Sequence, residues 1–121
     1  MSFPERHTVS VTTATGGGAT AFTSEPVRGR VAMVTYTAAT GSPFASTADF
    51  TITTEDTLQD LWVESNVTAT QTIYPLTAGD LTTGVASTIT EVPINAAFER
   101  LKIVVAQGGN TTNGTFMFVV A

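Results

Sequence analysis

The sequence predicts an all-β fold: a single-domain β-sandwich or jelly-roll of about eight or nine short, mainly antiparallel strands. Thr makes up about a fifth of the 121 residues, and this β-branched residue suits a pleated, half-buried surface. Short stretches that alternate apolar and polar residues recur along the chain, with Gly, Asn or Pro between them. This spacing is typical of strands joined by turns. No segment shows a helical period of normal length, so an α/β fold is not expected.

The first eight residues carry no clear pattern. We therefore treat residues 1–8 as a candidate flexible arm on a single domain that spans residues 1–121. The first strand is expected at residues 9–13 and ends before three consecutive glycines. A returning strand is expected at residues 19–23, with Phe22 turned inward.

Two strands with a clear period of two follow in the middle of the chain. Residues 27–37 alternate without interruption, which places Met33 on one face and Val34 on the other. Both faces of this long strand are expected to be covered towards its far end. Residues 48–54 place Phe50 on the face opposite to the neighbouring threonines.

The second half of the chain predicts five more strands. Pro75 limits one of them to a sheet edge or a strand end. The last two are separated by turn residues and are expected to form a hairpin. Residues 76–81 and 95–99 have room for one helical turn each, short of a normal helix. The five expected strands are 60–64, 71–76, 87–92, 100–107 and 115–120.

The charge balance argues against several classes of partner. The net charge is −5, whereas binding to nucleic acid needs clustered Lys and Arg. No apolar run reaches membrane-spanning length, and the first residues lack the apolar core of a signal peptide. We therefore expect neither a nucleic-acid nor a membrane partner, and no export. The absence of Cys excludes disulfides and thiolate metal sites.

The sequence offers no residue set that predicts catalysis, so we expect a protein that is not an enzyme and has no cofactor or metal. The single His, His7, lies in the candidate arm and lacks the packed surroundings of a catalytic base. Four acidic residues fall between Asp49 and Asp60, without the regular oxygen-ligand spacing of a calcium-binding loop. They are interpreted as residues that keep a turn soluble and protect a strand edge.

Four segments of the chain resemble small virion proteins of tailed bacteriophages, of the head decoration or cement type. The likeness extends from Val27 to the C-terminus, and its most specific part is ERLKIVVAQGGN followed by GTF. The four segments are ADFTITTED (48–56), TIYPL (72–76), ERLKIVVAQGGN (99–110) and GTFMFVV (114–120).

The resemblance implies a structural protein made in the cytoplasm of a bacterial host and located on the virion. Such a protein binds the outer surface of the capsid through the major capsid protein and stabilises the shell. It is commonly a homotrimer, and no active site is carried over. A tail or head-fibre component is the alternative within the same structural class.

The composition is compatible with a protein that hides part of its surface against neighbours. The chain is 42% hydrophobic and only 12% charged, about half the usual charged fraction. A monomer of this mass exposes roughly 6,000 Å², and one standard contact covers about 800 Å² on each partner. Val34, Ile94 and Phe98 are apolar residues that exceed the needs of one core, and they are our candidates for the subunit interface.

A ligand-binding β-sandwich, such as a carbohydrate-binding or adhesin module, is an alternative from another class. Trp62 and Tyr74 are suited to stacking on sugars, although aromatic residues on strands belong more often to a core or an interface. A row of exposed aromatic residues would favour the sugar-binding module. A binding face made of Thr, Ala and the N-terminal arm would favour the virion protein.

Overall fold

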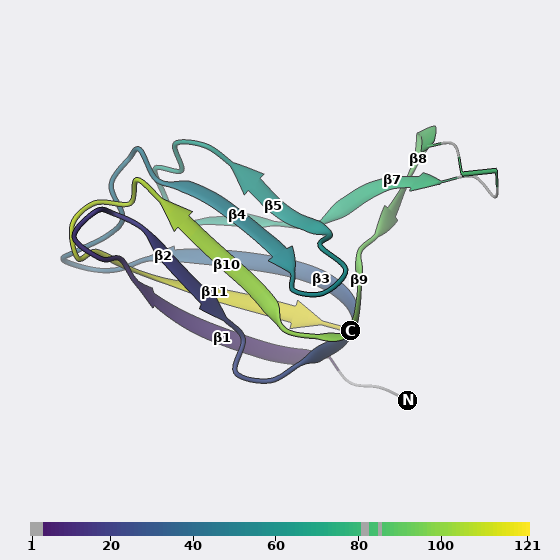
Figure 1. The fold of residues 1–121 in the computed structure, drawn as a ribbon, viewed down its shortest axis with the longest axis horizontal. Coiled ribbons are helices and arrows are strands. Elements are labelled where there is room, and N and C mark those ends of the chain that lie inside the picture. The colour runs from purple at the N-terminus through teal and green to yellow at the C-terminus, as the bar shows by residue number, and fades with distance from the viewer. Residues whose placement is uncertain (1–3, 81–82, 85) are drawn as a thin grey trace.

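The computed structural model describes residues 4–80, 83–84 and 86–121, and these residues form eleven strands and no helix (Figure 1). The all-β prediction is confirmed, with more strands than the eight or nine expected. The strands are β1 (Glu5–Thr12), β2 (Ala19–Phe22), β3 (Val27–Ala38), β4 (Asp49–Thr54), β5 (Asp60–Glu64), β6 (Gln71–Ile73), β7 (Leu76–Asp80), β8 (Ala86–Pro93), β9 (Asn95–Glu99), β10 (Leu101–Ala106) and β11 (Asn113–Val120).

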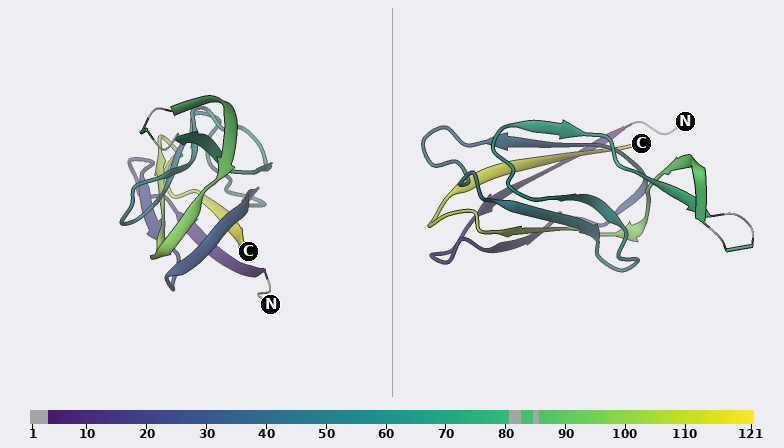
Figure 2. Two further views of the ribbon diagram at one scale, coloured as in Figure 1. Left: turned by 90° about the vertical axis from the view of Figure 1, so that its right-hand side faces the viewer. Right: turned by 90° about the horizontal axis from the view of Figure 1, so that it is seen from above.

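Two sheets pack face to face as a β-sandwich (Figure 2). The first has the order β1-β11-β3-β6, and β9 also pairs with β3. The second has the order β2-β10-β4-β5. The remaining strands, β7 and β8, pair with each other and project from one end of the sandwich (Figures 1 and 2). Every strand pairing is antiparallel.

An aromatic cluster fills the space between the sheets. The Phe50 ring lies at the centre, 5.0 Å from that of Phe116 and 5.2 Å from that of Trp62, edge to face in both cases. This geometry is the favourable one for aromatic pairs. Tyr36 and Phe44 complete the cluster. A core of this size stabilises the domain without disulfides, in agreement with the absence of Cys.

A β-bulge interrupts the alternation that the sequence predicts for β3. Val120 pairs with Val31 while Val119 pairs with Met33, so Ala32 is an extra residue in β3. As a result both Val31 and Val34 point into the core. The expectation that residues 27–37 alternate without interruption is therefore wrong.

Two of the three candidate interface residues belong to the core. Val34 is 0% exposed and Ile94 is 1% exposed. The bulge at Ala32 turns Val34 inward. The backbone of Ile94 is held against β3 by the N–H of Val31, which donates to its carbonyl. Both residues are corrected to core positions, because neither side chain is available to a neighbour.

The expected N-terminal arm is largely a strand. Residues 5–8 belong to β1, which pairs with β11 from Glu5↔Val120 to Thr12↔Asn113. Their weak pattern reflects an edge strand with one exposed face, and the edge of β11 supplies the hydrogen bonds that hold it. Residues 1–3 lie outside the described part of the chain.

Several expected local pairings are replaced by pairings across the fold. β2 pairs with β10 and not with β1, and β10 and β11 lie in different sheets, so the expected C-terminal hairpin is wrong. The turn between β10 and β11 crosses from one sheet to the other. Residues 76–80 and 95–99, which have room for a helical turn, are strands β7 and β9, because each finds a partner strand. Residue 81 of the first segment lies outside the described part of the chain.

Gly114 tests how tightly the aromatic cluster is packed. A Cβ atom at this position would lie 2.6 Å from Tyr36 Cε1 and 2.7 Å from Phe44 Cε2. We expect Gly114→Ala to lower the free energy of unfolding by about 1–3 kcal/mol, the usual cost of overpacking a core. Gly16→Ala is the matched control, since nothing lies within 4 Å of its added Cβ. Urea unfolding of both variants checks this, and equal stability of the two would contradict it.

Candidate interaction surface

Large exposed apolar side chains gather at the end of the sandwich from which β7 and β8 project, here called the hairpin end. The β3 start, the β4–β5 turn and β9 also lie there (Figure 1). Among the described residues, five large apolar side chains are more than half exposed. One of them, Val63, lies away from this end, on the outer face of β5. The other four are Leu58, Tyr74, Leu76 and Phe98.

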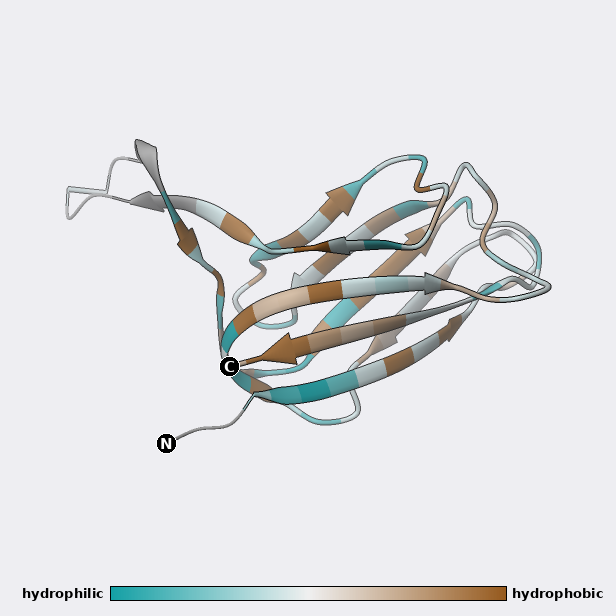
Figure 3. Cartoon of the chain, turned by 180° about the vertical axis from the view of Figure 1, so that it is seen from behind, coloured by the Kyte–Doolittle hydropathy of each residue, from teal (hydrophilic) through white to brown (hydrophobic). Residues whose placement is uncertain are grey.

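A groove of about 470 Å³ lies at the base of the projecting hairpin, here called the hairpin groove. Pro75 has no N–H to donate, so the chain leaves the sheet after β6, and Leu76 then pairs with Pro93. Tyr74 and Leu76 are 69% and 53% exposed beside it. Figure 3 shows β7 and β8 leaving the sandwich beside the start of β3, with apolar residues in each of these strands. The lining residues are Arg30, Val31, Ala32, Met33, Tyr74, Pro75, Leu76, Pro93 and Val119.

A second β-bulge places Phe98 on the surface. Val27 pairs with Glu99 and Arg28 with Ala97, so Phe98 is an extra residue in β9. Its φ is +55° and its side chain is 63% exposed. The guanidinium carbon of Arg28 lies 5.7 Å from the ring centroid, within range of a cation–π contact. Positive φ is unfavourable for a bulky residue, and such strain clusters at functional sites.

Leu58, in the turn between β4 and β5, is a second exposed apolar residue with a positive φ. Its φ is +56° and it is the most exposed of the large apolar residues that the structure describes, at 71%. Its N–H donates to the carbonyl of Thr54, which closes the turn. We call Arg28, Leu58 and Phe98 the bulge patch.

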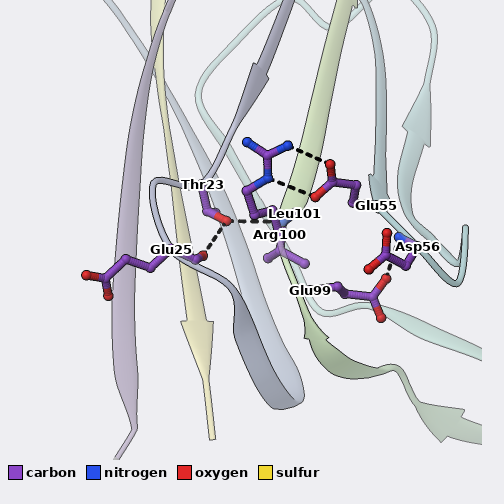
Figure 4. A network of polar contacts seen from close by, with 7 residues as sticks. All are labelled: Thr23, Glu25, Glu55, Asp56, Glu99, Arg100 and Leu101. Atoms are coloured by element: carbon purple, nitrogen blue, oxygen red, sulfur yellow. Dashed lines mark hydrogen bonds and ion pairs between the residues drawn. The ribbon is translucent and has the colours of Figure 1, made fainter.

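The buried carboxylate of Glu99 holds both parts of the bulge patch in place. Its Oε1 accepts hydrogen bonds from the N–H groups of Asp56 and Thr57, each 2.8 Å long, which fixes the turn before Leu58. Its Oε2 accepts from the N–H of Ala97 at 2.9 Å, which fixes the bulge before Phe98. Figure 4 shows Glu99 directed towards Asp56.

Electrostatics favour the ionised form of Glu99. Burial by itself would raise the pKa of this carboxyl, because the charged form loses water. The N–H groups of Thr57, Ala97 and Asp56, together with the Thr57 hydroxyl, outweigh burial and hold the pKa below its ordinary value. Glu99 is therefore a fixed anion that ties two backbone segments together.

An ion pair between Arg100 and Glu55 also holds the β4–β5 turn in place. Arg100 donates to Glu55 through Nε at 2.8 Å and Nη2 at 2.6 Å (Figure 4). These hydrogen bonds lower the pKa of Glu55. The guanidinium carbon also lies 4.2 Å from the ring centroid of Phe22, which is half-buried beneath it. The pair fixes the β4–β5 turn to the start of β10.

Two of the four acidic residues between Asp49 and Asp60 form side-chain contacts within the domain. Asp49 accepts from the N–H of Asn66, and Glu55 pairs with Arg100. In the described part of the chain no three His, Cys, Asp or Glu residues form a group that would hold a metal ion. His7 lies on β1 with Nε2 3.2 Å from Glu5 Oε2. No helix among the described residues is long and apolar enough to cross a membrane.

The two aromatic residues considered for sugar stacking are not exposed together. Trp62 is buried and donates its indole N–H to Glu64 at 3.0 Å. Tyr74 is exposed beside the hairpin groove. Of the three candidate interface residues, Phe98 alone lies on the surface. Sequence reasoning missed Leu58 and Glu99, and the only signal for Glu99 was a carboxylate set in the mostly apolar segment NAAFERL.

Comparison with known proteins assigns no family to the chain. No protein-family model matches it, and no curated protein matches it. A solved structure described as that of FLHE is similar over 98% of both chains, with 15% sequence identity and a TM-score of 0.47. At this level of similarity no property of that protein is carried over to this chain.

Replacement of Glu99 by Gln tests its structural role. The amide would direct its NH₂ group at backbone donors, so we expect Glu99→Gln to lower the free energy of unfolding by about 1.5–3 kcal/mol. Urea unfolding at neutral pH measures this. Glu25→Gln, at an exposed position, is the control and is expected to have little effect. Equal stability of the two variants would show that Glu99 does not hold the turn and the bulge.

The pH dependence of stability provides a separate test. Because the pKa of Glu99 is lower in the folded than in the unfolded chain, its contribution to stability is complete above the unfolded value, about 4.3. That contribution is lost as the pH falls through the lower, folded pKa. We therefore expect the stability difference between wild type and Glu99→Gln to shrink below about pH 4. Urea unfolding across the acid range measures it, and a difference that is constant with pH would contradict the assignment.

Proposed function

We propose that this chain is a structural virion protein that binds the outer surface of a tailed-phage capsid and stabilises the shell. Its partners are the major capsid protein and further copies of itself in a homotrimer. The observation that supports the proposal is the hairpin groove together with the hairpin that projects beside it. The resemblance of four segments to head decoration proteins gives the class of partner.

The projecting hairpin needs a partner for its own stability. Among the described residues β7 and β8 pair with each other and with no third strand. A lone two-stranded hairpin is at best marginally stable in water. A shell surface against which it packs would stabilise it.

The hairpin groove also favours attachment to another protein. Apolar surface that remains exposed is unfavourable, and contiguous patches of it mark interaction sites. Tyr74 supplies the kind of large side chain that dominates binding energy at protein interfaces. A shell subunit that covers Tyr74 and Leu76 would remove this surface from water.

Binding of this kind stabilises a shell by mass action. A protein that binds the assembled shell and not the free subunits shifts the equilibrium towards assembly. The folded chain exposes 6957 Å², more than the roughly 6,000 Å² expected for its mass, in keeping with an element that projects. One standard contact covers about 800 Å², so a shell and two neighbouring copies would each find room.

The same groove would serve a tail or head-fibre component. The two functions are distinguished by whether the protein binds to phage heads or to tails and head fibres. For a carbohydrate-binding module, the burial of Trp62 removes one of the two aromatic residues that suggested it. The virion protein remains the function with the most support.

Cosedimentation with expanded, empty phage heads tests the proposal. We expect saturable binding at a fixed ratio to the major capsid protein. Leu76→Asp should abolish most of this binding, because it places a charge in the contact. Thr20→Asp is the matched control, as Thr20 is exposed on β2 and pairs with Val104, far from the hairpin groove. Absence of binding to heads by the wild type would overturn the proposal, and binding to tails or head fibres alone would favour the alternative.

A further inference from the structure

The β5 strand forms one edge of its sheet and presents an apolar residue between charges. Among the described residues β5 pairs only with β4. Ile52 pairs with Trp62 and Thr53 with Asp60, so Leu61 is an extra residue and both Leu61 and Trp62 turn into the core. The outward side chains of β5 are consequently Asp60 and Val63, and Val63 is 62% exposed. We call these two residues the β5 edge.

Edge strands with exposed apolar residues tend to find partners. An unpaired strand edge is a template for association with another chain. Of the described large apolar residues, Val63 is the one that is exposed outside the hairpin end. Asp60 and the bulge at Leu61 discourage the addition of a further strand at this edge, so a partner is expected to contact its outward side chains.

The bulge patch has the complementary chemistry. Phe98 is held outward by a strained backbone, and Arg28 lies over its ring and forms no salt bridge within the described residues. Aromatic residues and Arg are the side chains most enriched among those that dominate binding energy at interfaces. The patch therefore fits a surface that is apolar and negatively charged.

We propose that the bulge patch of one copy binds the β5 edge of a second copy. Phe98 covers Val63, and Arg28 pairs with Asp60. Contact of like surfaces is unfavourable, because it opposes Arg28 to itself or Asp60 to itself. Contact of unlike surfaces is also what a cyclic trimer requires. The pairing deepens the homotrimer of the proposed function but does not depend on binding to a shell.

Charge reversal in the free protein tests this pairing. The wild type is expected to sediment as an oligomer in analytical ultracentrifugation. Arg28→Glu alone and Asp60→Arg alone each oppose like charges, so both variants should associate far more weakly. The double variant Arg28→Glu/Asp60→Arg carries both changes in every copy, so it restores opposite charges at every contact and should assemble as the wild type does, which native mass spectrometry detects. A wild type that remains monomeric, or a double variant that stays as dissociated as the single variants, overturns the pairing.

Apolar substitutions provide a second measurement. Phe98→Asp and Val63→Asp should each weaken self-association at least about 30-fold, as expected for a residue that dominates an interface. Both side chains are more than 60% exposed, so both variants should keep the urea unfolding midpoint of the wild type. Leu76→Asp in the hairpin groove should keep the oligomer while losing attachment to heads. Undiminished self-association of Phe98→Asp or Val63→Asp overturns the proposal, and failure of head binding alone leaves the pairing intact.

Discussion

The shared edge of β3 is the constraint on which the architecture of the hairpin end depends. The first half of this edge pairs with β9 and the second half with β6. The chain between β6 and β9 therefore cannot continue along the same edge and must leave the sheet. It does so as the hairpin of β7 and β8, and the gap at its base becomes the hairpin groove. The projecting hairpin and the hairpin groove therefore both follow from the pairing of one edge of β3 with two strands, β6 and β9.

Glu99 gives the same end of the molecule its rigidity. A carboxylate with three backbone N–H partners is stable when buried only because each partner is in place. The turn before Leu58 and the bulge before Phe98 are therefore fixed together. Each of these segments has a bulky residue at positive φ, which is unfavourable locally and persists because the surroundings determine it. Contacts in the core offset the unfavourable backbone conformation, and the result is an apolar side chain that is held in solvent.

The sequence was informative about strands and much less about their partners. Residues 60–64 match β5 at both ends, because alternation and turn residues are local signals. The assignment of β10 and β11 to different sheets depends on contacts far apart in sequence, which no local pattern contains. Val34 was misplaced for a related reason: a bulge changes which face a residue occupies without changing the composition. Phe98 was named with Val34 and Ile94 as an apolar residue in excess of one core, and of the three it is the one that lies on the surface.

Bulges are also the reason that Phe98 and the β5 edge are displayed by sheets and not by long loops. In a strand that alternates strictly, every second side chain points outward. A single apolar side chain can therefore be exposed next to a buried pair only where a bulge interrupts the alternation. One extra residue at Leu61 leaves Asp60 and Val63 outward, and the extra residue Phe98 is itself the side chain displayed. Side chains on a hydrogen-bonded sheet lose little further freedom when they bind. A rigid surface of this kind needs less burial for a given affinity, which would suit the contacts that we propose with a shell and with further copies.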